Sequence, residues 1–125
     1  VRQCPDVSFV LDHIGKPDIK GHVLDPWRAE LGELAQLSNV WCKVSGLVTE
    51  ADHEKWSAGD LRPYIDHVVE CFGFDRIMYG GDWPVSTQAA DYPRWVATLD
   101  EALRGCTREE LKKFYVSNAE RFYRV

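Results

Sequence analysis

Three short apolar runs along the chain predict strands. They cover residues 7–11, 40–44 and 76–79, and all are too short to be helices. The first two are rich in β-branched and aromatic residues, and we interpret all three as strands buried on both faces of a parallel sheet. The intervals between strand starts are roughly 33 and 36 residues, close to the ~31 residues that one unit of a (β/α)8 barrel takes.

Helical periodicity fills the segments between and after these runs. One stripe of apolar residues at helical spacing lies between the first two runs, and another lies between the second and the third. We predict that the second helix begins with Asp60 as its N-cap and ends at Gly73, which would adopt a left-handed conformation. After the third run we expect three more helices, which begin at Asp91, at the capping box Thr107–Glu110, and at Ser117. The first two stripes are Trp27, Leu31, Leu34 and Ala35, then Leu61, Tyr64, Ile65, Val68 and Phe72.

The predicted order β-α-β-α-β, followed by these further helices, indicates an α/β fold. It fits part of a (β/α)8 barrel, and it also fits an open doubly wound sheet. Three parallel strands with two unpaired edges make a poor independent sheet, so we expect residues 1–125 to form a partial barrel domain. The chain begins with Val1, and its only methionine is Met78. We therefore expect it to start partway through a longer protein.

Composition narrows the classes of partner and compartment. The 125 residues are 45% hydrophobic with a net charge of -5, which indicates a globular acidic protein. No Lys/Arg cluster and no apolar stretch of ~20 residues is present, which argues against a nucleic-acid or membrane partner. The four cysteines are at positions 4, 42, 71 and 106, so no two of them have the short spacing of a zinc knuckle or of a redox-active Cys pair. We interpret them as reduced, mostly buried thiols of a cytoplasmic protein.

Residues that could take part in catalysis or substrate binding follow each predicted strand. His13 follows the first, Ser45 and Gly46 the second, and Asp82 the third, within Gly80-Gly81-Asp82-Trp83-Pro84. In a barrel, catalytic side chains come from the carboxyl ends of several strands. An ordinary turn is the alternative at Asp82 and at Ser45, and a structural role is the alternative at His13.

The other histidines and Trp56 say less about function. We interpret His22, His53 and His67 as surface residues. Trp56 lies in a polar loop, where it either covers a pocket or packs the loop.

Taken together, segments 11–17, 42–47 and 79–85 resemble the amidohydrolase-related family, in particular its lactonases that open sugar or pyrone-dicarboxylate lactones. The resemblance extends to 60–64 and 118–123, and the combination of Asp-His-Ile-Gly-Lys-Pro with Gly-Asp-Trp-Pro is its most specific part. It implies a distorted TIM barrel whose sixth, seventh and eighth strands are those predicted above. The family's His-x-His pair of strand one and its groups on strands four and five have no counterpart here. Its usual serine is replaced by Gly81.

The resemblance implies hydrolysis of a small lactone. Asp82 would activate water and His13 would polarise the carbonyl, while Lys16, Ser45 and Trp83 would contact substrate. The family works either without a metal or with one divalent ion such as zinc, for which His13 and Asp82 would be ligands.

Several alternatives stay open. They are metal-dependent amide hydrolysis or decarboxylation on the same scaffold, a truncated non-catalytic remnant, and an open flavodoxin-like sheet. The last lacks a Gly-rich phosphate loop. The expected partners are the lactone, the missing N-terminal part of the barrel and, as an open option, further copies in a homo-oligomer. We expect the chain alone to be inactive.

Overall fold

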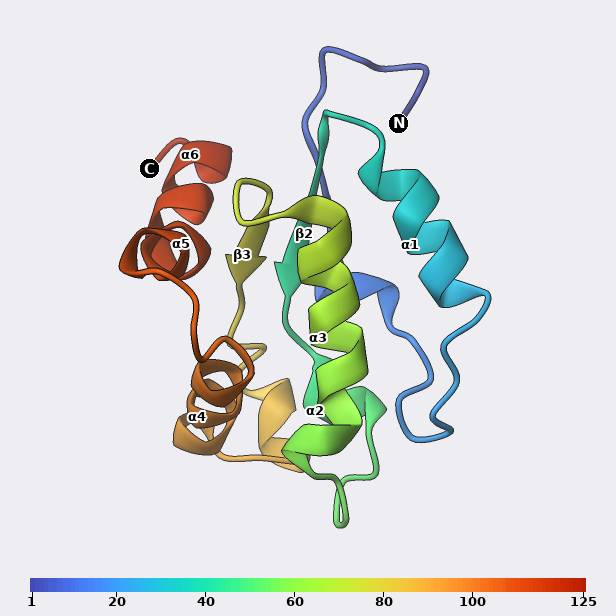
Figure 1. Ribbon diagram of the computed structural model, residues 1–125, viewed down its shortest axis with the longest axis vertical. Coiled ribbons are helices and arrows are strands. Elements are labelled where there is room, and N and C mark those ends of the chain that lie inside the picture. The colour runs from blue at the N-terminus through green and yellow to red at the C-terminus, as the bar shows by residue number, and fades with distance from the viewer.

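A three-stranded parallel sheet forms the centre of the computed structural model, which describes residues 1–125 (Figure 1). The strands are β1 (Phe9–Leu11), β2 (Val40–Val44) and β3 (Ile77–Tyr79), in the spatial order β1-β2-β3. Leu11 is paired with Cys42, and Val44 with Tyr79. Strands that follow one another in sequence order without a reversal are typical of a barrel wall, whereas an open doubly wound sheet reverses at a switch point.

Helices connect the strands and cover one face of the sheet. Helices α1 (Trp27–Ala35) and α3 (Ala58–Phe72) pack on each other and on β2, with α3 across the sheet in Figure 1. The apolar stripes predicted for both helices are confirmed, because Leu31, Leu61 and Ile65 are buried. The other segments are η1 (Asp12–Gly15), α2 (Leu47–Glu50), η2 (Val85–Gln88), α4 (Tyr92–Ala102), α5 (Arg108–Lys112), the π-helical η3 (Lys113–Ser117) and α6 (Asn118–Tyr123).

The start of α3 differs from the prediction. Ser57 is the N-cap, and the Asp60 carboxylate, three residues on, accepts hydrogen bonds from the Ser57 N–H at 2.7 Å and the Ser57 hydroxyl at 3.0 Å. The assignment of Asp60 as N-cap was therefore wrong, since the Ser-x-x-Asp pattern works as a capping box one turn earlier. At the other end Gly73 has the expected positive φ of 64°, but its ψ of 169° is extended and not left-handed helical.

The C-terminal segment is one helical rod and not two helices. The elements α5, η3 and α6 follow one another without a break from Arg108 to Tyr123. Ser117 has helical angles and makes no capping bond, so its prediction as an N-cap was wrong. The next residue, Asn118, is buried and donates to the carbonyls of Phe74 and Ile77 at 2.6 and 2.7 Å. These bonds hold the rod against β3, while Asp91 and Thr107 cap their helices as predicted.

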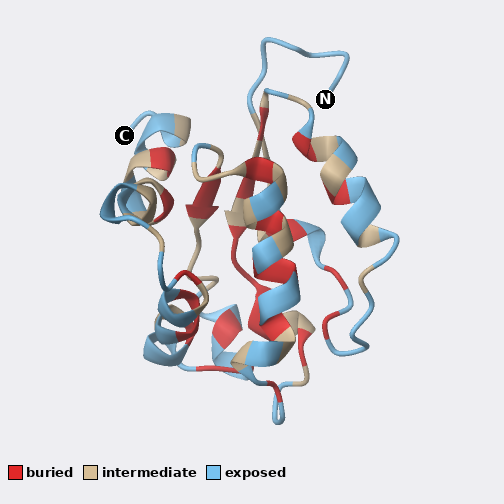
Figure 2. Ribbon diagram, viewed as in Figure 1, coloured by how far each residue is buried: buried red, intermediate tan, exposed pale blue.

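The core lies between the sheet and the helices packed around it, and it includes buried residues of α1, α3, α4 and η3 (Figure 2). Along β2, Val40, Cys42 and Val44 are buried, whereas Trp41 and Lys43 face the other side and are partly exposed. All of β1 is partly exposed as well. The expectation of strands buried on both faces was therefore wrong for β1 and β2: β1 is an edge strand, and Trp41 on β2 stays partly exposed although it packs against Phe122 of α6. None of the helices is both long and apolar enough to cross a bilayer.

Candidate active site

The chain turns sharply where β1 ends, and this turn places His13. His13 and Ile14 both have positive φ values, of 52° and 49°, which non-glycine residues adopt only at a cost. The Ile14 side chain is fully buried, and its carbonyl accepts a 2.7 Å hydrogen bond from the indole N–H of Trp27 on α1. Core packing and this bond hold the turn, and the imidazole of His13 consequently lies over the end of β2.

Residues at the end of β2 fix the imidazole ring. His13 Nδ1 lies 2.8 Å from the hydroxyl oxygen of Ser45, which is fully buried. Gly46 has φ 68°, and a Cβ atom there would lie 2.7 Å from His13 Nδ1 and 2.8 Å from Cγ. Only glycine therefore allows both this backbone conformation and the close approach of the ring. With Nδ1 engaged by Ser45, the Nε2 atom of His13 is the one left for chemistry.

Asp82 lies opposite that nitrogen. Its Oδ1 atom is 3.8 Å from His13 Nε2, and the two side chains are 13% and 25% exposed. Asp82 has φ 50°, and its carbonyl accepts a 2.8 Å hydrogen bond from the Ser86 N–H, which fixes the turn into η2. Close packing of Gly80 on Ser45 brings β3 to this distance, since a Cβ atom on Gly80 would lie 2.7 Å from Ser45 Cβ.

The two leading candidates therefore meet, as the sequence predicted. They come from β1 and β3 and face each other across the end of β2. Both are partly accessible, whereas Ser45 between them is not. A buried hydroxyl that is engaged by His13 cannot reach a substrate, which also argues against a Ser-His-Asp nucleophile triad. The structure thus gives Ser45 a positioning role in place of the predicted contact with substrate.

A second charged pair, missed in the sequence, lies beside the imidazole. Lys43 Nζ is 3.1 Å from Asp12 Oδ1, and Asp12 Oδ2 is 3.7 Å from His13 Nε2. Burial lowers the pKa of Lys43, but hydrogen bonding to Tyr123 and Asp12 raises it more, so the net pKa is above the ordinary value. A lysine at the centre of an apolar strand was the available signal, because alternation puts it on the face opposite the core.

Gly81 stands where the resemblance leads us to expect serine. The space that a side chain at this position would occupy is taken up by two tyrosines. A Cβ atom at Gly81 would lie 2.9 Å from Cε2 of Tyr92 and 3.4 Å from the Tyr79 hydroxyl. Burial, and then the neighbouring Tyr92, raises the pKa of Tyr79 well above its ordinary value. The Tyr79 phenol therefore stays neutral, and the Tyr79 and Tyr92 side chains occupy the volume that a larger residue would need.

The remaining candidates, Lys16, Trp83 and Trp56, do not join the His13–Asp82 pair. Lys16 forms a 3.2 Å ion pair with Glu50, and Trp83 is 70% exposed, so neither forms a pocket wall within this chain. Trp56 is buried and donates a 2.8 Å hydrogen bond to the Ala89 carbonyl, which makes it a loop-packing residue.

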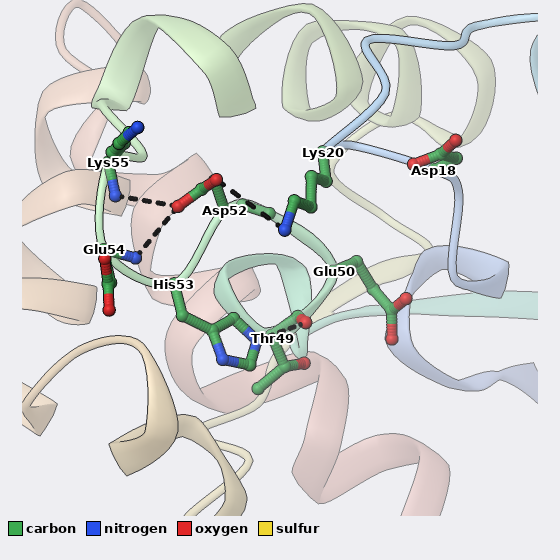
Figure 3. A pocket seen from close by; sticks show the side chains of 9 residues that line it. Asp18, Lys20, Thr49, Glu50, Asp52, His53, Glu54 and Lys55 are labelled. Atoms are coloured by element: carbon green, nitrogen blue, oxygen red, sulfur yellow. Dashed lines mark hydrogen bonds and ion pairs between the residues drawn. The ribbon is translucent and has the colours of Figure 1, made fainter.

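A polar depression of about 540 Å³ lies next to these loops (Figure 3). Among its charged groups, Asp52 accepts hydrogen bonds from the backbone N–H groups of Glu54 and Lys55, and its Oδ2 atom lies 3.7 Å from Lys20 Nζ. His53 is 2.9 Å from the Thr49 carbonyl. Neither His13 nor Asp82 lines this depression, so it is separate from the pair described above.

A metal ion would find only part of its ligand set in this chain. His13 and Asp82 offer two donors, and no group of three or more His, Cys, Asp or Glu side chains is arranged for a metal. Zinc sites in proteins use three or four protein ligands. The residues present therefore do not form a complete metal centre by themselves.

Comparison with known proteins places this geometry in a family. The model of the family described as amidohydrolase matches residues 1–125, the full chain. The chain belongs to the amidohydrolase family. The amidohydrolase chain is 45% identical over 119 residues to an L-fucono-1,5-lactonase of Burkholderia multivorans, a match that covers 80% of the chain and 40% of that relative. It is 35% identical over 85 residues to a 2-pyrone-4,6-dicarboxylate hydrolase of Comamonas testosteroni, covering 62% and 28%.

A solved structure supports the arrangement of the whole chain. An amidohydrolase from Burkholderia multivorans, crystallised with bound zinc, superimposes with a TM-score of 0.92 at 36% identity. The match covers 99% of this amidohydrolase chain and 46% of that structure. The chain thus spans less than half the length of these relatives.

Proposed function

We propose that the protein containing this chain hydrolyses a small sugar-derived or carboxylated lactone. The observation that carries the proposal is the pairing of a carboxylate with an imidazole, Asp82 and His13, at the carboxyl end of a parallel sheet. The names of the relatives, an L-fucono-1,5-lactonase and a 2-pyrone-4,6-dicarboxylate hydrolase, support the substrate class.

In the proposed mechanism Asp82 acts as general base. Its carboxylate takes a proton from a water molecule while the water oxygen bonds to the lactone carbonyl carbon. The N–H at His13 Nε2 stabilises the negative charge that develops on the carbonyl oxygen. When the ring C–O bond breaks, the leaving alkoxide takes the proton back from Asp82. One lactone and one water thus yield one hydroxy acid, and Asp82 is regenerated.

We also propose that β1, β2 and β3 are strands six, seven and eight of a distorted eight-stranded barrel. The resemblance of their carboxyl-end motifs and the consecutive strand order support this assignment. The sheet has a free edge at β1 and another at β3, and both would pair with further strands when a barrel closes. The same strands would contribute the remaining walls of the substrate pocket.

Replacement of Asp82 tests the base assignment. In the complete protein, Asp82→Asn should lower kcat for lactone opening by roughly 10²–10⁴-fold, the usual contribution of a general base. The matched control is Asp91→Asn, which changes the carboxylate that caps α4 through the Arg94 N–H. Both variants should keep the wild-type circular dichroism spectrum. Near-normal turnover of 1,5-lactones by folded Asp82→Asn would exclude Asp82 as the base.

A second candidate is metal-dependent hydrolysis on the same scaffold. It is favoured by the zinc bound in the Burkholderia multivorans neighbour. In the complete protein, stoichiometric zinc by elemental analysis, together with activity lost on chelation and restored by zinc, would favour this candidate. Full lactonase activity in a protein freed of metal would favour catalysis by Asp82 and His13 alone.

A further inference from the structure

The imidazole of His13 lies between two carboxylates. Its Nε2 atom is 3.8 Å from Asp82 and 3.7 Å from Asp12, so distance alone does not decide which of them it faces. The Asp82 backbone is held in its turn by the Ser86 N–H and its side chain is 13% exposed, whereas the Asp12 side chain is 56% exposed and is paired with Lys43 and His13. If Asp12 were free to rotate, it would compete with Asp82 for the imidazole.

Lys43 forms the closer ion pair with Asp12. Its ammonium group lies 3.1 Å from Asp12 Oδ1, nearer than Asp12 approaches His13, and at equal dielectric the closer pair is the stronger one. Lys43 is only 24% exposed, which reduces the solvent screening of this pair.

Lys43 is itself held on two sides. Its aliphatic part lies against Gly80, where a Cβ atom would lie 3.0 Å from Lys43 Cδ. Its ammonium group lies 5.6 Å from the centre of the Tyr123 ring, on the last turn of α6. The lysine is therefore fixed by β3 and by the C-terminal helix before it meets Asp12.

We propose that Lys43 is a positioning residue for His13, which acts by holding the Asp12 carboxylate so that Nε2 stays available to Asp82 and the substrate. The catalytic consequence rests on the proposed lactonase function. The positional consequence, the distance between Asp12 and His13, does not.

Kinetics of three variants in the complete protein test the catalytic consequence. Lys43→Met keeps the aliphatic part but frees Asp12, and it should lower kcat for lactone opening about tenfold with KM changed less than about twofold. The double variant Lys43→Met/Asp12→Asn removes the competing charge and should restore kcat to within about threefold. Lys113→Met, which breaks the 2.8 Å surface ion pair to Asp75, is the matched control and should leave kcat unchanged.

A purely structural role of Lys43 would give a different pattern, because the double variant would be no more active than Lys43→Met. That result, or wild-type kcat in Lys43→Met, would overturn the proposal. If Lys43→Met does not fold, Lys43→Gln, which also removes the charge, takes its place with the same expectations.

Crystal structures keep the test independent of the enzyme assay. In Lys43→Met the Asp12 carboxylate should move to hydrogen-bond distance of His13 Nε2, about 2.7–3.2 Å. An Asp12 that stays near 3.7 Å from Nε2 in this variant would overturn the proposal. If the wild type opens no lactone, the proposed function fails, and this distance alone then decides the inference.

Discussion

The contact between Gly46 and His13 allows a sharp test of the site geometry. Gly46→Ala would place a methyl group 2.7 Å from His13 Nδ1, where ordinary contacts begin at about 3.4 Å. The ring would have to move by roughly 0.7 Å. It cannot do so freely, because Ser45 engages the same nitrogen at 2.8 Å and that hydrogen bond would be stretched beyond its normal range.

Two separate effects follow from this substitution. The positive φ of 68° at Gly46 makes alanine unfavourable by roughly 1–2 kcal/mol, which lowers the free energy of unfolding. The displaced imidazole should lower kcat/KM by about 100-fold, the typical result of an ~1 Å misplacement, which corresponds to ~2.7 kcal/mol.

A control glycine separates the two effects. Gly105 lies between α4 and α5, has φ 99°, and has open space where a Cβ atom would lie. Gly105→Ala should therefore destabilise the complete protein in urea without reducing the activity of the folded fraction. The assay is lactone hydrolysis at a temperature where both variants remain folded. Equal activity of the two variants would refute the argument that Gly46 sets the position of His13.

Three further predictions concern stability and completeness. Asn118→Ala leaves the carbonyls of Phe74 and Ile77 without a donor and should cost roughly 2–4 kcal/mol in urea unfolding; a loss below ~1 kcal/mol would contradict this. Hydrogen bonding from Ser57 lowers the pKa of Asp60 below 3.8, so this carboxylate stabilises the fold at neutral pH and its contribution is lost as the pH falls. Asp60→Asn should accordingly cost about 1 kcal/mol at pH 7 and give a shallower pH dependence below about pH 5, whereas a slope equal to wild type would be inconsistent. Residues 1–125 expressed alone should show no lactone turnover, because both sheet edges are open; an active monomer with a sharp unfolding transition would disprove this.

Much of the fold could be predicted because periodicity reports burial directly. The stripes of α1 and α3 face the core as expected, and the three strands lie within the apolar runs that predicted them. The meeting of His13 and Asp82 could also be predicted, since parallel strands present their carboxyl ends at the same edge. No contact needed to be known for either inference.

The features that were missed depend on the face to which a side chain points. Ser45 follows β2 directly, and the sequence does not reveal that its hydroxyl turns inward to His13. The Lys43–Asp12 pair joins β2 to the turn after β1, so it needed the register of two strands. The predicted start of α3 was wrong for a local reason. Ser57 and Asp60 are both residue types that cap helices well, and only the backbone conformation shows which of them is the N-cap.

The left-handed backbone angles around the pair have a consequence for protein engineering. His13 and Asp82 both adopt φ values near 50°, a conformation in which glycine is intrinsically favoured, and neither side chain belongs to the core. A variant library selected only for expression level or thermal stability would accordingly accept glycine at these positions. It would enrich variants that are stable and well expressed but inactive. Directed evolution of this scaffold therefore needs a turnover screen from its first round.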